Sequence, residues 1–193
     1  MTFGQAFMQH ELHRQLSTRL GREQHLFSGI SRLMLDSFPD DPVLYVTEQG
    51  PADAAAVVFS STQEAQMIAM QKTLDFSVTP GTLQLLQAVP ESSLPLVMAA
   101  ARQLHQAGTV AMQEAGHKSY LKLMLLAARP EAQGSGLGSA VLEAVVAAAD
   151  RQQMPLYVEA AHDGLVPLYE RYAFKPRGKL DSMTLMVRDR SGL

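Results

Sequence analysis

The run Gln133-Gly134-Ser135-Gly136-Leu137-Gly138 carries three glycines at alternate positions. Glycine accepts a positive φ and lets a ligand approach the backbone, because it has no Cβ. The run separates an apolar stretch from an amphipathic one, so we expect a turn that leads from a strand into a helix. The first amides of a helix have no acceptor within it, and its dipole favours an anion there. These residues therefore predict a backbone cradle for a phosphate group.

Two familiar phosphate-binding loops do not fit this run. A P-loop ends in Gly-Lys-Ser/Thr, whereas Gly138 is followed by Ser139. A dinucleotide-binding fingerprint has glycines at its first, third and sixth positions. The sixth residue is Ser139 when counted from Gly134 and Val141 when counted from Gly136. Two interpretations are left: another kind of phosphate loop, and a tight strand-to-helix turn that binds nothing.

The surrounding sequence predicts the elements that hold this loop. Residues up to about 38 have the periodicity of helices, and residues 83–116 are predicted to be mainly helical with a break near Pro90. The pattern of residues 62–81 is ambiguous, with a helix through residue 72 as one interpretation. The stretch 120–128 is apolar apart from Lys122, so both faces of this strand are expected to be covered. Further helices are predicted at 139–151 and 165–172, and strands at 43–47, 54–60, 120–128, 156–160, 175–180 and 183–187. The first two strands form a predicted hairpin, and the order after residue 120 predicts a right-handed crossover between parallel strands, an α/β fold.

Composition narrows the range of functions. The chain has 193 residues, of which 47% are hydrophobic, and a formal net charge of −3, which suits one packed domain. Lys and Arg are scattered, which argues against a nucleic-acid-binding protein. The absence of cysteine excludes disulfides, thiolate metal ligands and a cysteine nucleophile, and the histidines show no metal-site context. With no visible signal peptide and no bilayer-spanning stretch, we expect a cytoplasmic protein without membrane contact.

The loop and its flanks resemble the GNAT superfamily of N-acetyltransferases. The family pattern Gln/Arg-x-x-Gly-x-Gly/Ala is present as Gln133-x-x-Gly136-x-Gly138. Residues 128–130, Ala-Arg-Pro, stand where the family usually has Val-x-Pro, and residues 168–174, Leu-Tyr-Glu-Arg-Tyr-Ala-Phe, resemble its Leu-Tyr-Glu-x-x-Gly-Phe signature. Between 121 and 174 the chain is most similar to the puromycin N-acetyltransferase-like group, with which it shares Gln-Gly-x-Gly-Leu-Gly-Ser-Ala-Val.

This resemblance implies a fold and a cofactor site. The fold would be a GNAT-like mixed central sheet flanked by helices, with splayed parallel strands at its centre. It would form a single domain over residues 1–193, with a helical insertion at about 62–117. The pyrophosphate of acetyl-CoA would bind the glycine loop, and the pantetheine arm would enter the gap like an extra strand. The implied cofactor-binding residues are Leu126, Ala128, Gln133, Gly134, Ser135, Gly136, Leu137, Gly138 and Ser139.

The resemblance also suggests two catalytic residues. An alkylamine has a pKa of about 10.4, like that of Lys, so it must lose a proton before it attacks. Glu159 is the candidate base, with a structural carboxylate as the alternative. Tyr169 is the candidate acid for the leaving thiolate, with a core aromatic as the alternative. A backbone amide near Ala128 would hold the oxyanion, and His117 or His162 would be within reach of the acceptor pocket. No metal is expected, and direct attack in a ternary complex is favoured because there is no cysteine.

Three functions stay open at this point. The leading one is acetylation of a primary amine on a small molecule. The others are acetylation of a protein N-terminus or lysine, and a non-catalytic acyl-CoA-binding regulatory module. Leu165 and Ala173 depart from the Asn and Gly that the family often has, and no first strand is recognisable near the N-terminus. A missing edge strand would leave an unpaired edge that a homodimer covers. The acceptor pocket is expected from residues 27–36 and 62–116.

Overall fold

A computed structural model describes residues 44–46, 53–73 and 94–190 of the chain. The helical region expected up to residue 38, the absent first strand and the break near Pro90 lie outside the described residues.

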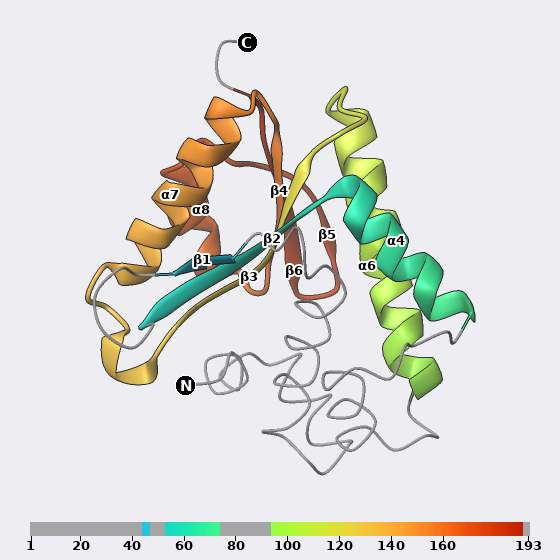
Figure 1. Ribbon diagram of the computed structural model, residues 1–193, viewed down its shortest axis with the longest axis horizontal. Helices are drawn as coiled ribbons and strands as arrows, with labels where there is room; N and C mark the ends of the chain where they lie inside the picture. The colour runs from blue at the N-terminus through green and yellow to red at the C-terminus, as the bar shows by residue number, and fades with distance from the viewer. Residues whose placement is uncertain (1–43, 47–52, 74–93, 191–193) are drawn as a thin grey trace.

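A mixed sheet forms the centre of the described structure (Figure 1). Its six strands in these residues follow the order β1-β2-β3-β4-β6-β5. The strands are β1 (Leu44–Val46), β2 (Ala54–Ser60), β3 (Leu121–Ala128), β4 (Leu156–Ala160), β5 (Lys175–Leu180) and β6 (Met183–Arg188). The pair β3–β4 is parallel and the other pairs are antiparallel. The predicted hairpin and the parallel central pair are therefore confirmed.

Helices cover both faces of this sheet. Figure 1 shows α7 and α8 together on one side of the sheet and α4 and α6 on the other. The helices are α4 (Ser61–Thr73), α6 (Leu94–Glu114), α7 (Leu137–Arg151) and α8 (Val166–Glu170). None of the helices in the described ranges has the length and hydrophobicity of a membrane span. The layered arrangement confirms the predicted α/β class, with a mixed sheet between helices.

Two helix boundaries differ from their sequence-based predictions. The helix expected from 139 begins at Leu137, because Gly136 adopts a left-handed conformation, φ 88°, and serves as the N-cap. The short helix expected over 165–172 is limited to α8. Leu165 belongs to the preceding 3-10 turn η3 (Asp163–Leu165), and the amide of Tyr172 donates to the carbonyl of Tyr169 in a closing turn.

Side chains from the two faces of the sheet form separate parts of the core. On the α7 face, strands β2, β3 and β4 pack against α7 and α8, with the buried residues Ala56, Val58, Leu121, Leu123, Leu156, Val158, Val141, Leu142, Val145, Tyr169 and Phe174. On the α6 face, Tyr120, Tyr157, Leu185 and Val187 pack against Ala111 and Met112. The sheet therefore separates two parts of the core, and both contain tyrosine side chains.

Candidate active site

The parallel strands β3 and β4 separate soon after they meet. Within the described residues they pair only at Leu121–Leu156 and Lys122–Tyr157, although β3 runs on to Ala128 and β4 to Ala160. The predicted gap between these strands is therefore present.

A β-bulge in β3 accounts for the gap. Leu123 faces Val58 and Leu125 faces Val57, so Met124 has no partner in β2. A bulge bends its strand and increases the local twist, here directly after the last pair with β4. Met124 and Leu125 consequently pack on the same face as Val57. From the bulge onward, β3 no longer pairs with the parallel strand β4.

The glycine loop follows the end of β3 and leads into α7. Gly134 and Gly136 have φ values of 80° and 88°, a region that side chains other than glycine rarely adopt. A Cβ built on Gly134, Gly136 or Gly138 would have no atom within 4 Å. The amide of Ala140 donates to the carbonyl of Gly136 at 3.0 Å, so the three preceding amides begin the helix without an acceptor inside it. The open backbone at this helix N-terminus has the donors and the space that a pyrophosphate requires.

The other predicted cofactor residues lie around this loop. Leu126 and Ala128 are half-buried on β3 beyond the bulge, at the edge of the gap. Gln133 follows the 3-10 turn η2 (Pro130–Ala132), and its amide donates to the carbonyl of Pro130 at 3.3 Å. Exposed positions are Gln133, Gly134, Ser135 and Gly136, and half-buried positions are Leu137, Gly138 and Ser139. The structure thus brings all the predicted cofactor residues to one end of β3 and α7.

Glu159 belongs to a buried group of charges, which we call the Lys122 cluster: Glu64, Lys122 and Glu159. The Lys122 ammonium lies 2.6 Å from Glu64 Oε1 and 2.7 Å from Glu159 Oε1. The exposed fraction of the side chain is 3% for Lys122, 6% for Glu64 and 13% for Glu159. One lysine from β3 therefore joins a carboxylate of α4 to a carboxylate of β4.

Aromatic and histidine side chains surround this cluster. The Tyr120 hydroxyl donates to Glu64 Oε2 at 3.2 Å, and His105 Nδ1 lies 3.2 Å from the same oxygen. The Lys122 ammonium is 5.4 Å from the centre of the Tyr157 ring, within the range of a cation–π contact.

The electrostatics of the cluster keep the lysine charged and the phenols neutral. Burial lowers the pKa of Lys122, but the coulombic attraction of Glu159 and Glu64 outweighs this effect, and the net shift is upward. Burial, with the nearby Glu64 charge, raises the pKa of Tyr120 to about 12. Burial and then Glu159 raise the pKa of Tyr157 as well.

Tyr169 approaches the gap from the opposite face of the sheet. It lies on α8 with 5% of its surface exposed, and its ring meets Phe174 edge-on at 5.6 Å. Burial raises the pKa of the Tyr169 hydroxyl, and the charge of Glu159 raises it further. The phenol consequently stays protonated, as a proton donor must. The catalytic roles of Glu159 and Tyr169 stay predictions.

The two histidines have different positions. His117 lies before β3, at the opposite end of that strand from the glycine loop, and its Nε2 is 2.8 Å from Asp189 Oδ1. It therefore does not join the candidate site. His162 follows β4 and immediately precedes η3, at the end of β4 that carries Glu159. In the described part of the chain, no group of three or more His, Asp or Glu side chains is arranged to hold a metal ion.

Sequence reasoning missed Lys122 and Glu64 as site residues. A lysine inside a strand with two covered faces requires a buried carboxylate partner, so Lys122 itself carried a usable signal. Glu64 gave none, because it precedes Lys122 by 58 residues and lies on a different element.

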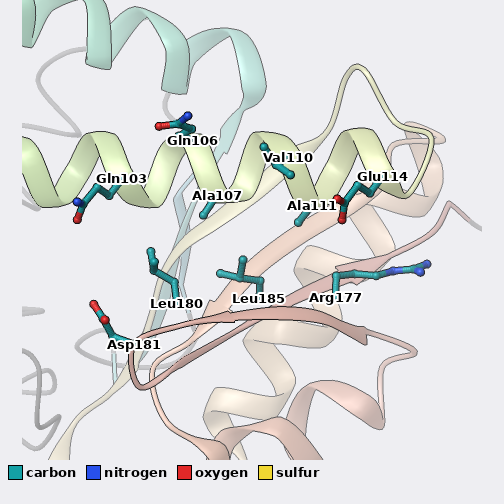
Figure 2. Close-up of a pocket in the computed structure, with 10 residues that line it drawn as sticks. All are labelled: Gln103, Gln106, Ala107, Val110, Ala111, Glu114, Arg177, Leu180, Asp181 and Leu185. Atoms are coloured by element: carbon teal, nitrogen blue, oxygen red, sulfur yellow. The ribbon is translucent and has the colours of Figure 1, made fainter.

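A groove lies on the same sheet face as the Lys122 cluster, between α6 and the β5–β6 hairpin (Figure 2). Its volume is about 490 Å³. Leu185 forms part of its wall and is the cross-strand partner of Glu159, and such partners lie on one face of a sheet. The remaining lining residues are Gln103, Gln106, Ala107, Val110, Ala111, Glu114, Arg177, Leu180 and Asp181. The groove therefore runs one strand away from Glu159.

Comparison with known proteins decides the family. The family model "Acetyltransferase (GNAT) domain" matches residues 76–182, a range that contains the glycine loop, Glu159 and Tyr169. The chain belongs to the GNAT acetyltransferase family. No curated protein matches the sequence. The fold and the family together make the chain an acetyltransferase enzyme, and the match does not distinguish the puromycin-like group.

Solved structures similar to this GNAT chain share its fold at low sequence identity. Arylalkylamine N-acetyltransferase 2 from Aedes aegypti is 11% identical, with a TM-score of 0.63 and coverage of 97% of this chain and 90% of that chain. A putative arylalkylamine N-acetyltransferase 7 from the yellow fever mosquito is 10% identical, with a TM-score of 0.61 and coverage of 94% and 78%. A histone acetyltransferase HPA2-related protein from Corynebacterium glutamicum is 15% identical, with a TM-score of 0.56 and coverage of 98% and 87%.

Proposed function

We propose that this GNAT enzyme transfers the acetyl group of acetyl-CoA to a primary amine of a small molecule by direct attack in a ternary complex. One observation carries the proposal. The β3–β4 gap opens beside the glycine loop, and Glu159 and Tyr169 flank it from opposite faces of the sheet. We also propose one domain over residues 1–193, with α4 and α6 in the helical insertion.

The glycine loop and the edge of β3 would hold acetyl-CoA. The first amides of α7 would donate to the pyrophosphate, where the helix dipole favours negative charge. Backbone groups near Leu126 and Ala128, beyond the bulge, would pair with the pantetheine amides. Bound acetyl-CoA supplies the thioester whose acetyl group is transferred. The chain contributes the orientation of this group, with the exposed loop at one end of the gap and buried strands at the other.

Glu159 and Tyr169 would carry the two proton transfers. An amine with a pKa of about 10.4 is mostly an ammonium at neutral pH, so the Glu159 carboxylate would first attract it and then accept a proton. Tyr169, protonated because its pKa is raised, would donate to the leaving sulfur from the other face. Each such transfer contributes about 10²–10⁴-fold to a rate.

The groove between α6 and β5–β6 supports a small-molecule acceptor. Its volume of about 490 Å³ is within the usual range for small-molecule sites. It contains the acidic residues Glu114 and Asp181 and an apolar floor that includes Ala111 and Leu185. Two of the similar structures are named arylalkylamine N-acetyltransferases, which also favours an amine with an apolar body. A panel of arylalkylamines, polyamines and peptides would separate this function from protein acetylation.

Calorimetric titration with acetyl-CoA tests the proposal. Gly138→Glu places a carboxylate in the open space of the cradle and should abolish binding by charge repulsion. Gly138 is a better position than Gly136 because it does not have a positive φ. The matched control is Ala144→Glu, which adds the same charge at an exposed position of α7, roughly 9 Å further along the helix axis. It should bind acetyl-CoA like the parent protein.

A thiol-release assay with the amine panel follows. The protein has no cysteine, so a thiol reagent detects only the CoA that the reaction releases. Amine-dependent release by the parent and by Ala144→Glu, with none from Gly138→Glu, is the expected result. If the parent does not bind acetyl-CoA, the proposal fails and the loop is a structural turn. Binding without release from any amine would favour the non-catalytic acyl-CoA-binding module.

A further inference from the structure

The Lys122 cluster spans the point where the sheet opens. Lys122 and Tyr157 form the last pair between β3 and β4, and Glu159 lies two residues beyond this pair on β4. Successive side chains alternate between the faces of a strand, so Glu159 returns to the face of Tyr157. The ion pair of 2.7 Å between Lys122 and Glu159 therefore connects the strands where their backbone pairing ends.

We propose that Lys122 is a positioning residue for acetyl transfer: anchored by Glu64, it holds the Glu159 carboxylate at the entrance of the β3–β4 gap. The inference rests on the proposed function, in which Glu159 is the base.

Glu64 is the fixed end of this arrangement. A capping box starts α4, in which the Ser60 amide donates to Gln63 Oε1 at 2.8 Å and the Gln63 amide donates to Ser60 Oγ at 3.2 Å. The amide of Ser61 also donates to the carbonyl of Tyr120 at 2.9 Å, which fastens α4 beside the start of β3. Glu64 in the first turn is favoured by the helix dipole. The start of α4 is therefore held in place, and it positions the Glu64 carboxylate against Lys122.

Glu159 is the member of the Lys122 cluster that would take part in the reaction. Its side chain is the most exposed of the three, at 13%, and it lies beside the groove wall through its partner Leu185. Packing does not explain the lysine, because apolar residues replace buried ion pairs without loss of stability in many proteins. A requirement to fix one carboxylate near the gap does explain it.

The cluster also sets the local charge. Two carboxylates and one ammonium leave one surplus negative charge to meet an incoming ammonium. The titratable groups that face the cluster on its own side of the sheet are His105 on α6, Tyr120 before β3 and Tyr157 on β4, and Tyr169 on α8 lies on the other side. The three phenols are neutral at working pH, so the charged neighbours of Glu159 in the cluster are Lys122 and Glu64.

Two substitutions should move the acid limb of the kcat/KM–pH profile in opposite directions. Lys122→Met leaves two carboxylates without the cation between them, so Glu159 ionises at higher pH and the acid limb moves up. Glu64→Gln leaves Lys122 to act on Glu159 alone, so the limb moves down. Lys122→Met should also lower kcat on the order of 100-fold through misplacement of the base, while the Kd of acetyl-CoA stays unchanged.

Combining the substitutions tests the coupling. In Lys122→Met/Glu64→Gln, the upward movement of the acid limb should shrink, because one of the two like charges is gone. If Lys122 had only a structural role, Lys122→Met would lower the amount of folded protein, but the acid limbs of the two single variants would not move in opposite directions. Should Lys122→Met fail to fold, Glu64→Gln alone carries the test through its downward movement. Acid limbs that stay in place, or move in the same direction in both single variants, would overturn the proposal.

A measurement without catalysis separates this proposal from the proposed function. Thermal unfolding of Lys122→Met should show a loss of stability that grows from about pH 4 to pH 7, as the two carboxylates ionise, and Glu64→Gln should relieve it. If the parent protein has no acetyltransferase activity, this unfolding result would still support the coupling of charges in the Lys122 cluster, and the role in acetyl transfer would be rejected. With an active parent and an unchanged acid limb, the positioning role alone would fail.

Discussion

Replacing Gly138 by glutamate should make the protein more stable and weaken its binding of acetyl-CoA, whereas alanine, which the GNAT pattern accepts at this position, should keep the binding. Gly138 is the second residue of α7 and does not have a positive φ, and a Cβ at this position would have no atom within 4 Å. Glutamate is favoured over glycine near a helix N-terminus by about 0.5–1 kcal/mol, through its helix propensity and the helix dipole. In a chain of this size the gain corresponds to a rise in Tm of about 1–4 °C.

The same glutamate side chain would occupy the space in which a phosphate meets the backbone. Loss of one hydrogen bond to a charged group costs about 1.5–3 kcal/mol, which corresponds to a Kd about 10–150-fold higher. The opposite signs of the two effects are the useful feature, because an ordinary destabilised variant would lose both stability and binding.

Thermal unfolding without ligand and calorimetry with acetyl-CoA measure the two effects in parallel. Gly116→Ala is the control: Gly116 has a φ of 83° and open space around its Cα, but it follows α6, far along the chain from the loop. Alanine there should cost about 1–2 kcal/mol of stability and leave acetyl-CoA binding unchanged. A Gly138→Glu protein that binds acetyl-CoA as tightly as the parent would refute the cradle.

Three further predictions concern the acid, the packing of α6 and the pH dependence of stability. Tyr169→Phe should lower kcat by about 10²–10⁴-fold with little change in acetyl-CoA binding; an unchanged kcat would show that Tyr169 is only a core aromatic. Gly108→Ala would place a Cβ 2.7 Å from Cε1 of the buried Tyr157 ring, so urea unfolding should show a loss of about 1–3 kcal/mol; a stabilised variant would contradict this contact. The hydrogen bond from His117 lowers the pKa of Asp189, so its contribution to stability is present above the ordinary Asp value and is lost as the pH falls through the lowered one. Acid unfolding of Asp189→Asn should lack that part of the pH dependence.

The sequence predicts the strands and the loop well, because their signals are local. The strands at 54–60 and 156–160 have the predicted bounds, since these apolar runs end at clear turn residues. The strand at 175–180 also has its predicted bounds, although its residues are mostly polar and exposed. The alternating glycines located the turn into α7, although the cap is Gly136 and the helix begins at once after it. The gap between the parallel strands was predicted from the family resemblance and not from local patterns.

The cause of the gap and the charges beside it required the structure. The bulge at Met124 depends on how β2 and β3 are aligned, and nothing in the composition of β3 marks one residue as unpaired. Lys122 was visible as a break in an apolar strand, but its link to Glu64 depends on where α4 starts relative to β3. Interactions across long stretches of chain therefore limit what the sequence predicts for this site.

The bulge in β3 shows how small a change in chain length separates a closed sheet from an open one. Over the paired region β3 holds one residue more than β2. That residue also reverses which side chains face which layer, so Lys122 lies in the polar layer while Leu126 and Ala128 pack with the apolar one. A deletion of a single codon at this point would restore regular pairing with β2. One additional residue in β3 is therefore enough to change which side chains face each layer and to accompany the end of its pairing with β4.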